Sequence, residues 1–134
     1  MTATVQQKIT YTSTNVDMEA FHRAFDAALV EVRAEAGKAH PLHIDGKAIE
    51  VPGGDTIVDV SPIDTGFVLG RFASAQPSHV DLAIRGAKQA QKAWAALPWQ
   101  GRVRILRRAA ELIRERKFLL SAIMSYEVGK NRFE

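Results

Sequence analysis

Residues 126–134 read YEVGKNRFE, and the interpretation of the whole chain starts from this stretch. Gly129 follows an apolar segment and stands where helices commonly end in a left-handed residue, a conformation that glycine adopts without strain. A new polar segment begins directly after Gly129 and is cut off almost at once. We therefore expect a helix that ends at Gly129, and we expect the sequence to be the first part of a longer protein.

Three helices are predicted in the second half of the chain. Near Ser78 the apolar period changes from two to 3.6, and Ser78 with Asp81 resembles a capping box. The run LPW at 97–99 ends this helix, and two more are expected over about 101–117 and 118–128. Their faces are marked by Val80, Ile84, Ala87, Gln91 and Trp94 in the first, by Val103, Leu106, Ala110 and Ile113 in the second, and by Leu119, Leu120, Ile123 and Met124, expected to be buried, in the third.

The first half of the chain is expected to hold one helix and four short strands. Apolar residues at helical spacing predict a helix over 18–36, with Asp17 as N-cap and Gly37 directly after its end. Asp45 and Gly46 can adopt the positive φ angles of a tight turn between two strands. Alternation of apolar and polar residues predicts strands over 42–44, 47–51, 56–60 and 67–73.

The predicted strands are too few for a finished sheet. Short strands leave unpaired edges, and a sheet this small needs further strands from elsewhere. The order of elements is α/β, with a helix, short β-hairpins and then three helices. This order independently favours a fold that continues beyond the sequence.

Composition favours a globular, cytoplasmic protein. The chain has 134 residues, 46% hydrophobic and 25% charged, with no cysteine. Disulfides, thiolate metal sites and a cysteine nucleophile within this chain are therefore excluded. The longest apolar runs, such as residues 118–120, are far too short to span a bilayer, and the first residues do not form a signal peptide.

Two local patterns are weighed as binding sites and set aside. His40 and His43 have the spacing of a metal-binding pair, but Pro41 prevents the helix that would bring both onto one face. Gly53-Gly54 precedes a strand and not a helix, so the pair does not fit a phosphate-binding loop.

Several motifs, in the right order, resemble the aldehyde dehydrogenase superfamily. Residues 42–47 (LHIDGK) resemble its opening "I-x-G-x-W" strand, although Ala48-Ile49 replaces the usual aromatic residue. Residues 59–66 (DVSPIDTG) are similar to its "N-P-x-T-G" turn, with Ser61 where asparagine is usual. The helix from Val80 to Trp94, the "R-x-x-x-L-x-x-x-A" pattern from Arg102, and the "E-x-G-K" segment from Glu127 complete a resemblance over residues 42–134.

One subfamily resembles the chain more than the others. Residues 37–42 (GKAHPL) and 126–131 (YEVGKN) are similar to segments of the 1-pyrroline-5-carboxylate dehydrogenases. These enzymes oxidise L-glutamate γ-semialdehyde to glutamate in proline degradation. The resemblance implies an aldehyde-dehydrogenase-like fold of which this chain is the N-terminal part, truncated before the dinucleotide-binding sheet. Residues 1–17 would be a flexible arm, and residues 18–134 an incomplete segment of the NAD-binding domain.

The resemblance also implies the chemistry. A cysteine attacks the aldehyde, an oxyanion hole stabilises the alkoxide, and hydride passes to NAD before glutamate-activated water hydrolyses the thioester. These residues and the phosphate-binding glycines belong to family segments beyond Glu134. No catalytic or cofactor-binding residue is therefore assigned, and the chain alone is expected to be inactive. The whole enzyme is expected to bind a small aldehyde and NAD and to form a homo-oligomer.

Some aldehyde dehydrogenases hold a monovalent cation near the "N-P-x-T-G" turn and near the acidic residue before the "G-K" pair. The matching groups here are Asp59, the carbonyl of Val60 and Glu127. Hard oxygen ligands suit such a cation. The structural alternative is that Asp59 caps the turn and Glu127 faces solvent.

The strongest competing interpretation is a self-standing basic helical module that binds nucleic acid or an acidic partner. Residues 101–134 carry 9 Lys and Arg against 4 Asp and Glu, whereas residues 1–100 carry 9 against 11. Glu111 and Glu115 interrupt this basic helix, and it lacks the aromatic or groove-reading motif of nucleic-acid sites. The arginines concerned are Arg102, Arg104, Arg107, Arg108, Arg114 and Arg116.

Overall fold

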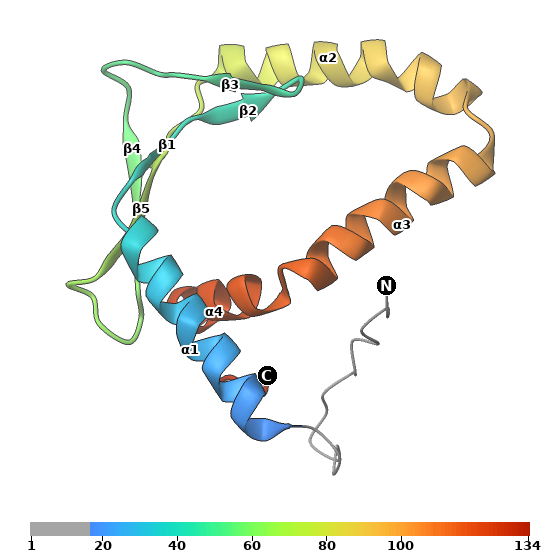
Figure 1. Ribbon diagram of the computed structural model, residues 1–134. Coiled ribbons are helices and arrows are strands. Elements are labelled where there is room, and N and C mark those ends of the chain that lie inside the picture. The colour runs from blue at the N-terminus through green and yellow to red at the C-terminus, as the bar shows by residue number, and fades with distance from the viewer. Residues whose placement is uncertain (1–16) are drawn as a thin grey trace.

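The computed structural model describes residues 17–134, and these contain four helices and five short strands. The chain is arranged as an open ring (Figure 1). The first and last helices pack against each other at one end of the ring, the second helix lies across the ring from them, and the third runs from the second back to the last. The predicted α/β order is confirmed. The predicted arm lies almost wholly outside the described residues.

Helix α1 (Met18–Glu35) begins where predicted and ends one residue earlier than predicted. Asp17 Oδ1 accepts a hydrogen bond from the backbone N–H of Ala20 at 2.9 Å, which satisfies one of the free donors at the helix start. Gly37, just beyond the helix, has φ 76° and donates its N–H to the carbonyl of Leu69 at 3.0 Å. The end of α1 is thereby attached to the sheet.

Strand β1 (Ala39–His40) was not among the four predicted strands. It pairs in parallel with β5 (Val68–Ala73), while β4 (Thr56–Val60) pairs antiparallel with the other edge of β5. Pro41 keeps His40 in an extended conformation. The Arg71 N–H then reaches the carbonyl of Lys38 at 2.9 Å. The extra strand is defined by this long-range pairing. Two residues are too few to show an alternating pattern, so the sequence did not predict it.

Strands β2 (Leu42–Ile44) and β3 (Lys47–Ile49) form the predicted hairpin as a separate two-stranded sheet. Asp45 and Gly46 have φ angles of 53° and 71°, as a type I′ turn requires. The second strand is two residues shorter than predicted, because Val51 leaves the ladder and accepts the Gly54 N–H at 3.1 Å in the next turn.

The three remaining helices are α2 (Pro77–Ala96), α3 (Trp99–Glu115) and α4 (Lys117–Val128). The predicted start of α2 at Ser78 was wrong. Gln76 is its N-cap, and the Gln76 N–H donates to Nδ1 of His79 at 3.0 Å, while Pro77 occupies the first turn. Helix α3 likewise begins earlier than predicted, since Trp99 follows a proline that is preorganised for a helix start. Gly129 ends α4 in the left-handed conformation, as predicted.

The core of the described residues is small. Phe21, Phe25 and Ala28 of α1 and Ala122 of α4 are its buried apolar residues. The aromatic ring of Phe118 meets that of Phe21 at a centroid distance of 5.7 Å. The predicted burial of α4 through Leu120, Ile123 and Met124 was wrong, because the helix turns its Ala122 side toward α1 and leaves those three side chains exposed.

Helices α2 and α3 keep their apolar faces exposed. Trp99, Leu106 and Ile113 lie seven residues apart on α3 and are 62%, 63% and 59% exposed. Their spacing places them on one side of the helix. On α2, Val80 and Ile84 are exposed in the same way. None of the described helices combines the length and the hydropathy that a membrane crossing requires.

Candidate functional site

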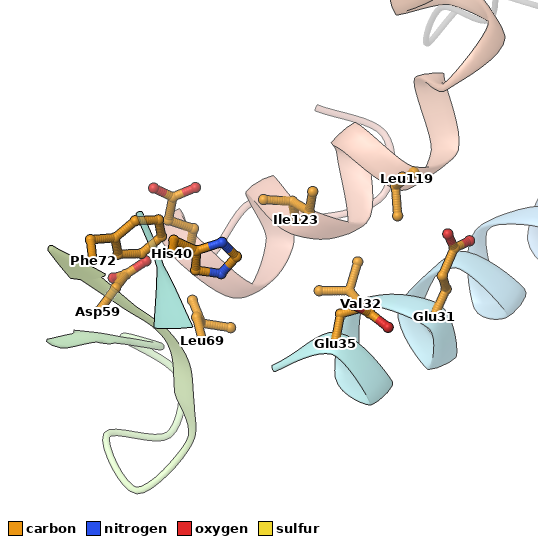
Figure 2. Close-up of a pocket in the computed structure, with 10 residues that line it drawn as sticks. Glu31, Val32, Glu35, His40, Asp59, Leu69, Phe72, Leu119 and Ile123 are labelled. Atoms are coloured by element: carbon orange, nitrogen blue, oxygen red, sulfur yellow. The ribbon is translucent and has the colours of Figure 1, made fainter. Parts of the chain in front are cut away.

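A cavity of about 300 Å³ lies where α1, α4 and the three-stranded sheet meet (Figure 2). Its apolar wall consists of Val32 from α1, Leu69 from β5, and Leu119 and Ile123 from α4. Figure 2 shows Leu119 and Ile123 projecting from α4 across the space from Val32.

One end of the cavity is closed by an aromatic pair. The rings of His40 and Phe72 lie nearly parallel, at an angle of 15° and a centroid distance of 4.8 Å. Gly70, two residues before Phe72 on β5, leaves room for this packing. A β-carbon at this position would come within 2.9 Å of the Phe72 ring and 3.2 Å of the His40 ring. Sequence reasoning missed this role, although a glycine inside a strand is a signal for close approach.

Four carboxylates also line the cavity: Glu31, Glu35, Asp59 and Glu127. Glu35 forms an ion pair with Lys38, which follows the end of α1. Asp59 and Glu127 are 68 positions apart in the sequence, and the fold brings both to this one cavity. Two of the three groups predicted to bind a monovalent cation therefore line the same cavity. The third residue, Val60, follows Asp59 on β4, and its side chain is exposed.

The described residues do not form a complete metal site. Among residues 17–134, histidine and acidic side chains nowhere gather in threes close enough to hold a metal ion. Asp59 and Glu127 would need ligands from elsewhere in addition to the Val60 carbonyl. The cation site accordingly stays a prediction.

The turn after β4 is stabilised by residues other than Asp59. Ser61 is buried, its N–H donates to the carbonyl of Phe67 at 3.0 Å, and its Oγ accepts from the Ile63 N–H at 3.3 Å. Asp64 Oδ1 accepts from the Gly66 N–H at 3.0 Å. The Asp59 side chain takes no part in these hydrogen bonds. Ser61, which stands where the family motif has asparagine, stabilises the turn together with Asp64.

The arginines of α3 do not form one uninterrupted basic surface. Arg108 Nη1 donates to Glu111 and to Glu115, each at 3.2 Å. The hydrogen bond to Glu111 and then that to Glu115 raise the pKa of the Arg108 guanidinium above its usual value, so it stays charged and paired. Arg102 donates to the carbonyl of Leu97 at 2.6 Å, at the end of α2. Toward partners within residues 17–134, Arg104, Arg107, Arg114 and Arg116 form no ion pair.

Neither of two turns in this segment has the form of a dinucleotide-phosphate loop. The turn at Gly53-Gly54 leads into strand β4, so its backbone N–H groups are not followed by a helix N-terminus. The connection from β5 to α2 over residues 74–76 contains no glycine. Within the described residues, neither turn can form the glycine-rich cradle that a pyrophosphate requires.

The sequence is similar to those of known aldehyde dehydrogenases. The sequence model described as "Aldehyde dehydrogenase family" matches residues 50–134. A 1-pyrroline-5-carboxylate dehydrogenase from Oceanobacillus iheyensis is 36% identical over 106 residues, which are 79% of this chain and 20% of that protein. Betaine aldehyde dehydrogenase 1 from Rhizobium meliloti is 40% identical over 99 residues, 74% of this chain and 20% of that protein.

Solved structures agree with the sequence match. The structure of 1-pyrroline-5-carboxylate dehydrogenase from Thermus with bound NAD superposes with a TM-score of 0.83 and 34% identity, covering 98% of this chain and 25% of that one. The chain spans about a fifth of the length of the curated relatives named above. The family match covers more than half of the chain, and the chain therefore belongs to the aldehyde dehydrogenase family.

Proposed function

We propose that this chain is the N-terminal segment of an NAD-dependent aldehyde dehydrogenase that oxidises L-glutamate γ-semialdehyde to L-glutamate. The observation that carries the proposal is the superposition of nearly the whole chain, α1 included, on the Thermus 1-pyrroline-5-carboxylate dehydrogenase. A relative of the same name from a Geobacillus species is 37% identical over 87% of this chain. Betaine aldehyde dehydrogenase 1 is 40% identical over 74% of this chain, so betaine aldehyde is the competing substrate to be tested.

The role of the segment in this proposal is structural. Helices α1 and α4 with the small sheet form a framework around the cavity of Figure 2. The exposed apolar faces of α2 and α3 offer surfaces for further parts of the enzyme to cover. Nucleophile, general base and NAD site belong to those further parts, because this chain has no cysteine and its turns do not fit the cofactor.

Activity assays of the isolated chain test the first part of the proposal. Incubated with NAD and glutamate γ-semialdehyde, the 134-residue chain is expected to form no NADH above a buffer control, because no thiol is present to form the thioester. A matched reaction with betaine aldehyde should also form no NADH above the buffer control. NADH formation by the purified chain, proportional to its concentration, would contradict the assignment.

The substrate is tested on the product of the complete reading frame that contains this chain. We expect kcat/KM for glutamate γ-semialdehyde to exceed that for betaine aldehyde by at least about tenfold, a preference of about 1.4 kcal/mol in transition-state binding. The reverse preference would keep the family and overturn the substrate. A complete reading frame without any cysteine would exclude this dehydrogenase mechanism. It would favour the alternative, a basic helical module that binds nucleic acid or an acidic partner.

A further inference from the structure

Strand β4 lies at an open edge of the three-stranded sheet. Within residues 17–134 the strand order is β1-β5-β4, so β4 has a neighbouring strand on one side and none on the other. The edge of a sheet presents backbone N–H and C=O groups that can pair with a further strand. The outer edge of β4 is therefore a surface to which an extended segment can bind through its backbone.

The register with β5 shows which backbone groups point outward. The Ser74 N–H donates to the carbonyl of Asp55 at 2.8 Å, which makes these two residues a hydrogen-bonded pair. Hydrogen-bonded and non-hydrogen-bonded pairs alternate along an antiparallel ladder, so Ile57 also directs its N–H and C=O toward β5. The N–H and C=O groups of Thr56 and Val58 consequently point away from β5.

The opposite strand agrees with this assignment. Arg71 is the partner of Val58 in the register. Its N–H donates to the carbonyl of Lys38 at 2.9 Å, on the β1 side of β5. The backbone of Arg71 is thus turned away from β4, as expected for a non-hydrogen-bonded pair. Val58 therefore directs its own N–H and C=O to the open edge.

Both faces of β4 carry exposed apolar side chains. Successive side chains of a strand point to opposite faces of its sheet. Ile57 is 61% exposed and Val58, on the other face, is 44% exposed. A helix packed on the sheet would cover only one of these faces, whereas a strand added at the edge places side chains beside both. The exposure on both faces favours a strand as the occupant.

The sequence of β4 does little to keep its edge free. Residues 56–60 read TIVDV, with four β-branched residues and with neither proline nor lysine, which commonly prevent pairing at exposed edges. The ladder with β5 is irregular only between Asp59 and Val60, at one end of the strand. The Asp59 side chain lines the cavity of Figure 2. The backbone of residues 56–58 is thus regular and open to a partner.

The size of the solved relative indicates where the partner strand comes from. The superposition covers 98% of this chain but 25% of the Thermus dehydrogenase chain. A segment of the same polypeptide is tethered to β4 and binds at a high effective concentration, which a separate protein does not. We propose that an extended segment beyond Glu134 pairs with the outer edge of β4 and forms a fourth strand of the sheet. This inference rests on the proposed function, because it requires a longer enzyme.

Amide hydrogen exchange of the product of the complete reading frame tests the pairing, with mass spectrometry resolving single residues. The N–H groups of Thr56 and Val58 should exchange at least about a hundredfold more slowly than in an unstructured peptide, because each donates to the added strand. The Ile57 N–H, which faces β5, is the slow reference, and the Gly53 N–H in the exposed turn before β4 is the fast one. Exchange of Val58 as fast as that of Gly53 would overturn the proposal.

Photo-crosslinking of the same full-length protein identifies the partner segment. The photoreactive residue p-benzoylphenylalanine replaces Ile57 in one variant and Val58 in another, and unirradiated samples are the control. Because the two positions lie on opposite faces, both should link to neighbouring residues of one segment beyond Glu134, within a single chain. Four results would overturn the proposal: links between subunits, which double the chain mass, links confined to residues 1–134, links to two unrelated segments, or no link at either position.

Dehydrogenase activity with glutamate γ-semialdehyde, assayed on the parent protein, separates this inference from the proposed function. An active enzyme with fast exchange at Val58 would keep the function and overturn the added strand. Slow exchange and intrachain links in a protein without this activity would overturn the function and support the added strand. A complete reading frame that ends at Glu134 would overturn both.

Discussion

At the scale of single residues, Asp17 shows how one side chain sets the start of an element. Its carboxylate accepts the Ala20 N–H at the N-terminus of α1, where the backbone has no partner of its own and where a negative charge favours the helix dipole. Asp81 lies within the first turns of α2 and makes no such bond, because Gln76 and His79 already form that cap. Two aspartates near helix starts therefore have different expected effects on stability.

We predict that Asp17→Ala lowers the free energy of unfolding by about 1 kcal/mol. Asp81→Ala should change it by only a few tenths of a kcal/mol, the contribution of a charge near a helix start. Urea unfolding followed by circular dichroism at 222 nm would measure both. Equal effects of the two substitutions would mean that the cap of α1 does not contribute to stability.

Glu127 is the residue on which the predicted cation site can be tested. It lines the cavity together with Asp59, and neither carboxylate forms an ion pair with a partner among residues 17–134. In the full-length enzyme, Glu127→Gln should lower the thermal midpoint more in sodium than in a buffer whose cation is large and organic. Sodium at about five times its Kd would account for about 1 kcal/mol of that difference.

Glu31→Gln is the matched control for that experiment. Glu31 lines the same cavity but is not among the predicted ligands, so its substitution should cause the same loss in both buffers. Equal losses for Glu127→Gln would leave it a structural residue at the end of α4.

At the scale of elements, the α1–α4 pair carries most of the buried packing. The small side chain of Ala122 is completely buried and lets the two helices approach closely, while Phe21 and Phe25 fill the space beside it. Phe25 is 3% exposed, and the guanidinium carbon of Arg132 lies 5.0 Å from the centre of its ring. Val30, on the opposite side of the same helix, is 70% exposed.

We predict that Phe25→Ala destabilises the chain by about 3–5 kcal/mol, the usual loss for a large core aromatic residue. That loss is comparable with the whole stability of a small domain, so the variant should be largely unfolded at 25 °C. Val30→Ala should keep the parent unfolding curve. A folded Phe25→Ala variant by circular dichroism would show that α1 and α4 do not form the core.

At the scale of the whole molecule, most apolar surface is not covered within the described residues. Helix α2 lies across the ring from the α1–α4 pair and α3 runs from α2 back to α4 (Figure 1), and the side chains of Trp99, Leu106 and Ile113 on α3 are about 60% exposed within residues 17–134. Monomeric proteins rarely keep large contiguous apolar patches exposed. The isolated chain should therefore unfold over a broad temperature range and bind a hydrophobic dye.

Replacing Trp99, Leu106 and Ile113 together by serine should remove most of the dye fluorescence. The matched control replaces Arg107, Glu111 and Arg114 by serine on the polar side of the same helix, and it should leave the fluorescence unchanged. A sharp two-state transition in a monomer that binds no dye would show that the chain covers its own apolar surface.

Local chemistry made much of the fold predictable. Asp17, Asp45-Gly46 and Gly129 act through hydrogen bonds and φ angles that involve only near neighbours, so the start of α1, the hairpin turn and the end of α4 were predicted correctly. The helical periods of α2 and α3 likewise predicted their existence. The start of α2 was missed because a proline and a histidine cap replaced the expected serine.

Long-range contacts decided the rest. The sequence by itself determined the order of elements, the local turns and the family motifs, because these depend on residues that are close in the chain. Only the tertiary structure showed that β1 pairs with β5, that α4 turns Ala122 toward α1, and that Asp59 and Glu127 share a cavity. It also brought Arg132 to His22, 110 residues away. Such pairings depend on how whole elements pack, and no local pattern of residues records which distant partner will be there.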